Sequence, residues 1–202
     1  MKKRFFGVLA AACVCVFLQG VIHTQQLQQD MAGKVLRFHV LANSDEEGDQ
    51  QLKLSVRDAV GTMMAEKLKN VDSLEESRAV VTQNLNEIRD TAQETVRRQG
   101  YDYPVTAAME TCRFPEKTYG KFTFPAGSYE ALRVVIGSGG GHNWWCVMYP
   151  NMCFSGSMYE VDASSGEILR KTLDPQEYQA VLEEGNYEIK FKILGFLNNL
   201  LE

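Results

Sequence analysis

The sequence LRFHVLANSD at residues 36–45, followed by QLKLSVRDAV at residues 51–60, is the stretch around which this chain is organised. Apolar residues alternate with Arg37 and His39 between residues 35 and 41, which predicts a strand with one buried face and one polar face. The polar run Asn-Ser-Asp then ends the strand. The stretch therefore predicts a strand, a tight polar corner and a helix.

Two long helices are predicted after this corner, at about residues 45–68 and 74–99. Both show apolar side chains at helical spacing. Each starts at a serine, Ser44 or Ser73, that is followed three positions later by a glutamate, which is the spacing of a capping box. Gly100 is the residue type expected just beyond the second helix.

The second half of the chain is rich in short β-type runs with prolines at their ends. A hairpin across residues 158–173 and a helix from Asp174 to about Gly185 are predicted next, whereas the tail at 187–201 fits either a strand or a helix. The predicted class is α+β, with a mainly antiparallel sheet, two long N-terminal helices packed on one face and an additional C-terminal helix. The predicted strands of the sheet after the helices are residues 103–114, 119–124, 130–136 and 144–149.

The N-terminus has the layout of an export signal. Basic residues at positions 2–4 precede an apolar run at 5–18, so residues 1–22 are interpreted as a signal peptide or an N-terminal membrane anchor. Residues 23–34 are interpreted as a polar linker, and residues 35–202 as a single α+β domain.

The charge balance excludes some partners. The formal net charge is −5, and three of the positive charges lie in the N-terminal segment, so the remaining domain is more acidic still. Binding to nucleic acid or to anionic lipid requires clustered lysine and arginine, and neither is expected here.

The cysteines outside the export segment are Cys112, Cys146 and Cys153. An exported protein favours disulfides, and residues 150 and 151 could turn the chain between Cys146 and Cys153, so these two are predicted to be bonded. The alternative is a pair of buried, reduced thiols. Cys112 is interpreted as a core residue of a strand.

Three blocks of sequence carry a resemblance to a known family. They are FHVLANSD with LKLSVRDAV, then FPEKTYG with PAGSYEAL, then GHNWWCVMYP closing on Cys153 and Phe154. Their order and content resemble the stage II sporulation protein R family, over about residues 35–154. Such proteins are secreted by the forespore of endospore-forming bacteria into the space between the two membranes. The resemblance implies a signal that activates a membrane-embedded aspartic protease of the mother cell, which processes a sigma-factor precursor.

Enzymatic readings have weaker support in the residues. His39 with Ser44 or Cys146 as nucleophile would make a secreted hydrolase, which is the alternative function, but no motif places a nucleophile on a strained turn. Residues 138–141 are glycine-rich yet lack the lysine of a phosphate-binding loop. His39 and His142 show no metal-ligand spacing. We expect no cofactor, no metal and no small-molecule substrate.

The predicted functional feature is therefore a partner-binding surface for the membrane protease. Adjacent tryptophans point to opposite faces of a strand, so one of them could anchor an interface. The residues assigned to this surface are the corner Asn43, Ser44 and Asp45, the helix residues Arg57 and Asp58, and Trp144 and Trp145 within the loop from Gly141 to Cys153.

Overall fold

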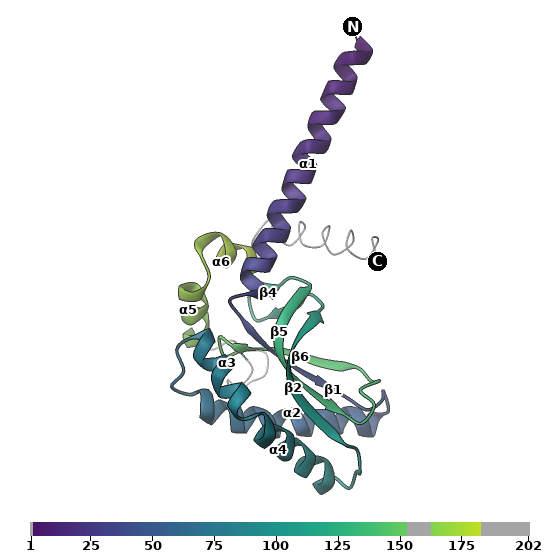
Figure 1. Cartoon of the computed structure of the whole chain (residues 1–202), viewed down its shortest axis with the longest axis vertical. Coiled ribbons are helices and arrows are strands. Elements are labelled where there is room, and N and C mark those ends of the chain that lie inside the picture. The colour runs from purple at the N-terminus through teal and green to yellow at the C-terminus, as the bar shows by residue number, and fades with distance from the viewer. Residues whose placement is uncertain (1, 153–162, 183–202) are drawn as a thin grey trace.

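The computed structural model describes residues 2–152 and 163–182 (Figure 1). It is an α+β fold, as predicted, with a mixed four-stranded sheet, a separate two-stranded hairpin and six helices in the described residues. The helices are α1 (Lys2–Ala32), α2 (Glu47–Leu68), α3 (Leu74–Gln83), α4 (Leu85–Arg98), α5 (Ala163–Thr172) and α6 (Pro175–Val181). The strands are β1 (Leu36–Leu41), β2 (Val105–Phe114), β3 (Lys117–Tyr119), β4 (Phe122–Phe124), β5 (Gly127–Ile136) and β6 (Asn143–Tyr149).

The sheet has the order β2-β5-β1-β6. Strand β1 pairs parallel with β5 and antiparallel with β6, and β2 pairs antiparallel with β5. We predicted a mainly antiparallel sheet, and the central parallel pair departs from that prediction. It arises because three helices follow β1, and such a long connection allows a later strand to return in the same direction.

All six residues of β1 are buried, which corrects the prediction of a strand with one polar face. Helices α2, α3 and α4 cover the face that carries Phe38 and Val40 (Figure 1). The β3–β4 hairpin and the end of α1 cover part of the opposite face, where Arg37 and His39 lie. The two polar residues of β1 are therefore core residues.

The second long helix is divided in two. Asn84 ends α3 and precedes α4, and its side-chain amide donates to the carbonyl of Val80 at 2.7 Å. An asparagine side chain competes with the helical backbone for hydrogen bonds, which explains the break. Ser73 caps α3 as predicted, accepting from the backbone of Glu76, and Gly100 has the positive φ of +83° expected beyond a helix end.

The stretch interpreted as a linker is helical. Helix α1 continues to Ala32, and Leu27 and Met31 are buried in the core against β5, whereas Leu18 and Ile22 are exposed (Figure 1). Leu27 and Met31 are spaced four residues apart, as on one face of a helix, but the residues between and before them are polar, so no apolar face is evident in the sequence. Among the helices, as far as they are described, none combines the length and the apolar character needed to cross a membrane.

The C-terminal part differs from the predicted hairpin. Residues 163–172 form α5, so the predicted strand at 167–173 is wrong; isoleucine and leucine at 168 and 169 are compatible with either structure. Helix α6 begins as predicted, because Asp174 and Glu177 form a capping box and Pro175 occupies the first turn. The predicted strand at 158–162 and the tail at 187–201 lie outside the described residues.

Candidate interaction surface

The predicted corner forms a hydrogen-bonded cluster around an acidic residue of α2. Asp49 accepts from the Asn43 amide at 2.8 Å and from the Ser44 hydroxyl at 2.6 Å through the same oxygen, Oδ2. Ser44 was predicted to cap the helix, but α2 begins at Glu47 after Glu46, and the Ser44 hydroxyl instead accepts from the Glu46 amide at 3.2 Å. We call Asn43, Ser44, Asp45, Asp49 and His142 the polar corner.

Asp49 is the buried base of the polar corner, with 3% of its surface exposed. Burial alone raises the pKa of its carboxyl group, but hydrogen bonds from Ser44 and Asn43 outweigh that effect and hold the pKa below its usual value. The carboxylate is therefore charged at neutral pH and fixes both side chains of the turn. Its effect is to give the corner one conformation.

The glycine-rich connection between β5 and β6 passes over the end of β1 and joins the polar corner. Because β1 lies between β5 and β6, this connection is not a hairpin turn between neighbouring strands. The amide of Gly140 donates to Asn43 at 3.2 Å, and that of Gly141 donates to Ala42 at 3.0 Å. A Cβ atom at Gly141 would lie 2.1 Å from the carbonyl oxygen of Ser44, so only glycine permits this approach.

The exposed part of the polar corner is a pair formed by Asp45 and His142. Oδ1 of Asp45 accepts from the backbone amide of His142 and contacts its Nδ1, each at 2.5 Å. The backbone hydrogen bond is the main cause that lowers the pKa of Asp45, followed by the side-chain contact. The two side chains are 56% and 82% exposed, so a partner has access to both.

Helix α2 continues the surface towards β6. Lys53 donates to the carbonyl of His142 at 3.0 Å, and the guanidinium of Arg57 lies 5.3 Å from the ring centre of Trp144. Arg57 also forms an ion pair with Asp58 at 2.7 Å. Asp49, Lys53 and Arg57 are spaced at four-residue intervals, so they lie on one face of the helix. The structure thus joins the predicted corner to Arg57, Asp58 and Trp144.

Trp145 lies on the opposite face of the sheet, as alternation along β6 predicts. Its ring stacks on His39 with 3.7 Å between ring centres. Both tryptophans are partly exposed. The predicted surface is therefore divided by the sheet, and Trp145 does not belong to the same side as the polar corner.

The geometry around His39 does not form a hydrolase site. His39 is 5% exposed, and neither ring nitrogen has a hydrogen-bond partner within the described part of the chain. Burial, followed by the positive charges of Arg133 and Arg37, lowers the pKa of His39 to about 3. Ser44 is bonded to Asp49, and Cys146 pairs with Phe38 in the register and so points to the other face. A base and a nucleophile in contact are the minimum for this chemistry.

Sequence reasoning missed the buried arginine of β1. Arg37 has no exposed surface, donates to the Cys146 carbonyl at 3.0 Å and to the Tyr119 hydroxyl at 3.1 Å, and its Nη1 has no partner among the described residues. The rings around its guanidinium carbon belong to Phe114, Tyr129, Phe124 and Tyr119, with centres at 4.4, 4.9, 5.4 and 5.7 Å. These four rings and Arg37 form the arginine cage. No local sequence signal connects residues so far apart in the chain.

The cysteine predictions have different outcomes. Cys146 is buried and disulfide-bonded, whereas Cys153 lies outside the described residues, so the pairing of these two cysteines stays a prediction. Cys112 is a free thiol on β2 and is partly exposed, not a fully buried core residue.

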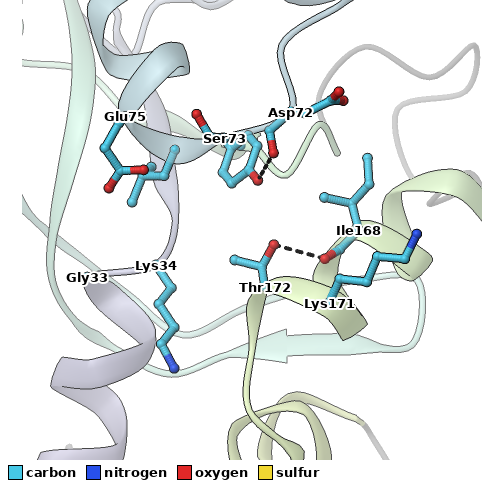
Figure 2. A pocket seen from close by; sticks show the side chains of 10 residues that line it. Gly33, Lys34, Asp72, Ser73, Glu75, Ile168, Lys171 and Thr172 are labelled. Carbon is cyan, nitrogen blue, oxygen red and sulfur yellow. Dashed lines mark hydrogen bonds between the residues drawn. The ribbon is translucent and has the colours of Figure 1, made fainter.

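A cleft of about 590 Å³ lies between the end of α1, the start of α3 and α5 (Figure 2). Its charged side chains are of both signs, including Lys34, Lys171, Asp72 and Glu75. Lys34 is bound at 2.6 Å to Glu177, outside the cleft lining. The cleft thus presents no consistent charge to a ligand. Within the described residues, no group of three or more acidic, histidine or cysteine side chains is arranged to hold a metal ion.

The fold and this surface define a class: an α+β domain whose distinctive polar residues form a rigid surface corner. Comparison with known proteins is consistent with the family resemblance. The family model of Stage II sporulation protein R matches residues 32–159. The chain is 37% identical over 155 residues to Stage II sporulation protein R of Bacillus subtilis (strain 168), which covers 75% of this chain and 66% of that relative. The chain belongs to the stage II sporulation protein R family. No solved structure matches it.

Proposed function

We propose that this protein is a secreted signal that activates a membrane-embedded aspartic protease during endospore formation, and so leads to processing of a sigma-factor precursor. Family membership supports the sporulation role. The basic-then-apolar pattern of the first 22 residues supports export into the space between the forespore and mother-cell membranes. The protein itself supplies a binding surface and no catalysis.

The observation that carries this proposal is the exposed Asp45–His142 pair on its rigid base. The two residues come from segments far apart in the chain. The His142 amide donates to Asp45, and the amide and hydroxyl of Ser138 donate to Asn43, so hydrogen bonds join the two segments. A preorganised surface loses little conformational entropy when a partner binds. Within the described residues, the hydrogen bonds to the Asp45 carboxylate, from His142 and from Gln50, all reach Oδ1, so Oδ2 retains the capacity to accept hydrogen bonds from the protease.

The test is the substitution Asp45→Asn, with two measurements on the same variant. We expect precursor processing to fall about tenfold in a non-sporulating host that co-expresses the protease and the precursor, because a lost interfacial charge–hydrogen bond has roughly that effect. The melting temperature of the purified domain should change little, since Asp45 is exposed and asparagine keeps most of the turn geometry.

The matched control is Asp90→Asn on α4, an aspartate at least as exposed as Asp45, whose partner in the described residues is the neighbouring Arg89. This control should process the precursor normally. Normal processing by Asp45→Asn would show that the polar corner is not part of the interface. Absence of processing with the unaltered protein would refute the proposed function itself.

The substitution His39→Ala distinguishes a signalling protein from a hydrolase that uses His39. A signalling protein retains activity as long as the variant folds, whereas the hydrolase loses it.

A further inference from the structure

Strand β2 forms one edge of the four-stranded sheet and is unusually regular. It pairs with β5 through ten consecutive residues, from Val105 opposite Ile136 to Phe114 opposite Gly127, without a bulge. Edge strands present a row of unpaired backbone groups that can bind another strand. Only the backbone groups that point away from β5 and have no partner can bind such a strand.

The register determines which amides point outwards. The amide of Gly137 donates to the carbonyl of Pro104 at 2.9 Å, which makes residues 104 and 137 a hydrogen-bonded pair. Hydrogen-bonded and non-bonded pairs alternate in an antiparallel ladder, so the odd-numbered residues of β2 direct both backbone groups away from β5. Val105 agrees with this assignment, because its amide donates to the side chain of Gln93 instead.

Gln93 on α4 satisfies only the beginning of this edge. Its side-chain amide donates to the carbonyl of Tyr103 at 2.9 Å and accepts from the amide of Val105 at 3.0 Å, as an added strand would. The next outward residues are Ala107, Met109 and Thr111. Among the described residues, no group pairs with their outward amides and carbonyls. Thr111 is exposed and the other two are partly exposed.

Several of the usual protections of an edge strand are missing from β2. There is no bulge, no lysine and no proline between Pro104 and Pro115, and the charged residues of the strand are Glu110 and Arg113. Helix α4 contacts β2, and its Gln93 bonds to the edge at Tyr103 and Val105. Ala107 and Ala108 are both partly exposed, and their small side chains present little bulk to an added strand, although Ala107 packs partly against the core. A protein that keeps such an edge has the structure required for strand addition.

We propose that the edge from Ala107 to Thr111 binds an extended segment of the protease, which adds to the sheet as a further strand. The identity of this partner rests on the proposed function. Three outward amides and three carbonyls at alternate residues match an extended backbone and no compact ligand. A second copy of the chain fits less well: antiparallel pairing about Met109 would bring the two Glu110 carboxylates onto one face as diagonal neighbours, about 7–8 Å apart.

The test is proline substitution at neighbouring positions of β2. In Thr111→Pro the lost amide faces solvent, so the variant should fold with a melting temperature close to that of the unaltered protein. Precursor processing, and co-purification of the full-length protease from the co-expressing host, should both fall at least about tenfold, because proline removes a donor and blocks the incoming strand. Ala107→Pro should reproduce this loss.

Glu110→Pro tests the same register at a residue whose amide should bond to β5. Its amide points into the ladder, so this variant should melt about 5–10 °C lower. The control Glu75→Pro places proline in the first turn of α3, where proline is tolerated, and should leave processing unchanged. Hydrogen exchange of the free domain should be fast at Ala107, Met109 and Thr111 and slow at Ala108 and Glu110.

Three outcomes would overturn this inference. The first is a folded Thr111→Pro variant that processes the precursor and binds the protease as the unaltered protein does; the proposed function would then stand without the edge. The second is slow exchange at the three outward amides. The third is a concentration-dependent dimer that Thr111→Pro abolishes, which would assign the edge to a second copy. If the precursor is not processed even with the unaltered protein, the proposed function is refuted, and this inference is refuted with it.

Discussion

The two ends of β1 hold a buried charge in opposite ways. Arg37, at the start of the strand, lies in the arginine cage with two hydrogen bonds and no carboxylate partner within the described residues. Asp49, beside the far end, lies at the base of the polar corner and accepts from two neighbouring side chains. The first arrangement depends on aromatic packing between distant segments. The second depends on local hydrogen bonds and leaves exposed groups above it.

This difference indicates separate roles for the two ends. A guanidinium is weakly hydrated and stacks on aromatic faces, so the arginine cage fixes the β3–β4 hairpin to the four-stranded sheet. A carboxylate that fixes a turn positions the residues around it for contact with a partner. The cage should therefore matter for stability, and the polar corner mainly for recognition.

The largest effect is expected at the cage. Arg37→Ala should lower the free energy of unfolding by about 3–5 kcal/mol, because it opens a cavity among the rings and leaves the Cys146 carbonyl and the Tyr119 hydroxyl without their donor. Arg37→Met fills most of the volume and should cost less than about 2 kcal/mol. Urea unfolding of the two variants measures the difference. Equal losses would mean that the charge, not the packing, stabilises the cage.

A smaller effect is expected at the base of the polar corner. Asp49→Ala leaves the Asn43 amide and the Ser44 hydroxyl without their acceptor and should lower the free energy of unfolding by about 1.5–3 kcal/mol. Asp90→Ala on α4 removes a carboxylate that is 67% exposed and paired with an exposed arginine, and should change stability by less than about 0.5 kcal/mol. Similar values for the two variants would contradict the assignment of Asp49 as the base of the corner.

The third effect, at most about 1.4 kcal/mol for each pH unit, concerns the residue between the two ends. His39 has a pKa of about 3 in the folded protein against an ordinary value of 6.5, so the unfolded chain binds the extra proton between these values. The stability from this group is present above pH 6.5 and is lost as the pH falls towards 3, with a slope of at most about 1.4 kcal/mol per pH unit.

The comparison is with His39→Phe, which keeps the aromatic stack on Trp145 and has no proton to bind. Urea unfolding between pH 7.5 and 4.5 should show a steeper loss of stability for the unaltered protein than for this variant. Parallel curves would show that His39 does not contribute to acid sensitivity.

Local patterns predicted much of the fold. The strand–corner–helix unit, the caps at Ser73 and Asp174, and the helix end at Gly100 all depend on residues close in sequence. The corner Asn43-Ser44-Asp45 was also identified, but its partners Asp49 and His142 were not. Glycines at 137–141 that allow close backbone approach were the available signal for His142.

What local patterns could not predict depends on contacts between distant segments. The parallel β1–β5 pair and the arginine cage require the positions of strands that are separated by the helices. An arginine between apolar residues has the same sequence pattern whether it faces solvent or a cage of rings. The helical linker was missed for a related reason, because Leu27 and Met31 are apolar residues isolated among polar ones.

The burial of Leu27 and Met31 sets a limit on where the proposed export segment could be cleaved from the domain. Thr24 is already 3% exposed, whereas Ile22 is 54% exposed, so the structural border of the folded body lies between them. A cut before Thr24 releases the domain intact, and a cut after Leu27 removes part of its core. If the segment is retained, α1 joins it to the body without a spacer. The helical rise from Ile22 to Thr24 is only about 3 Å, so the body would lie close to the membrane surface.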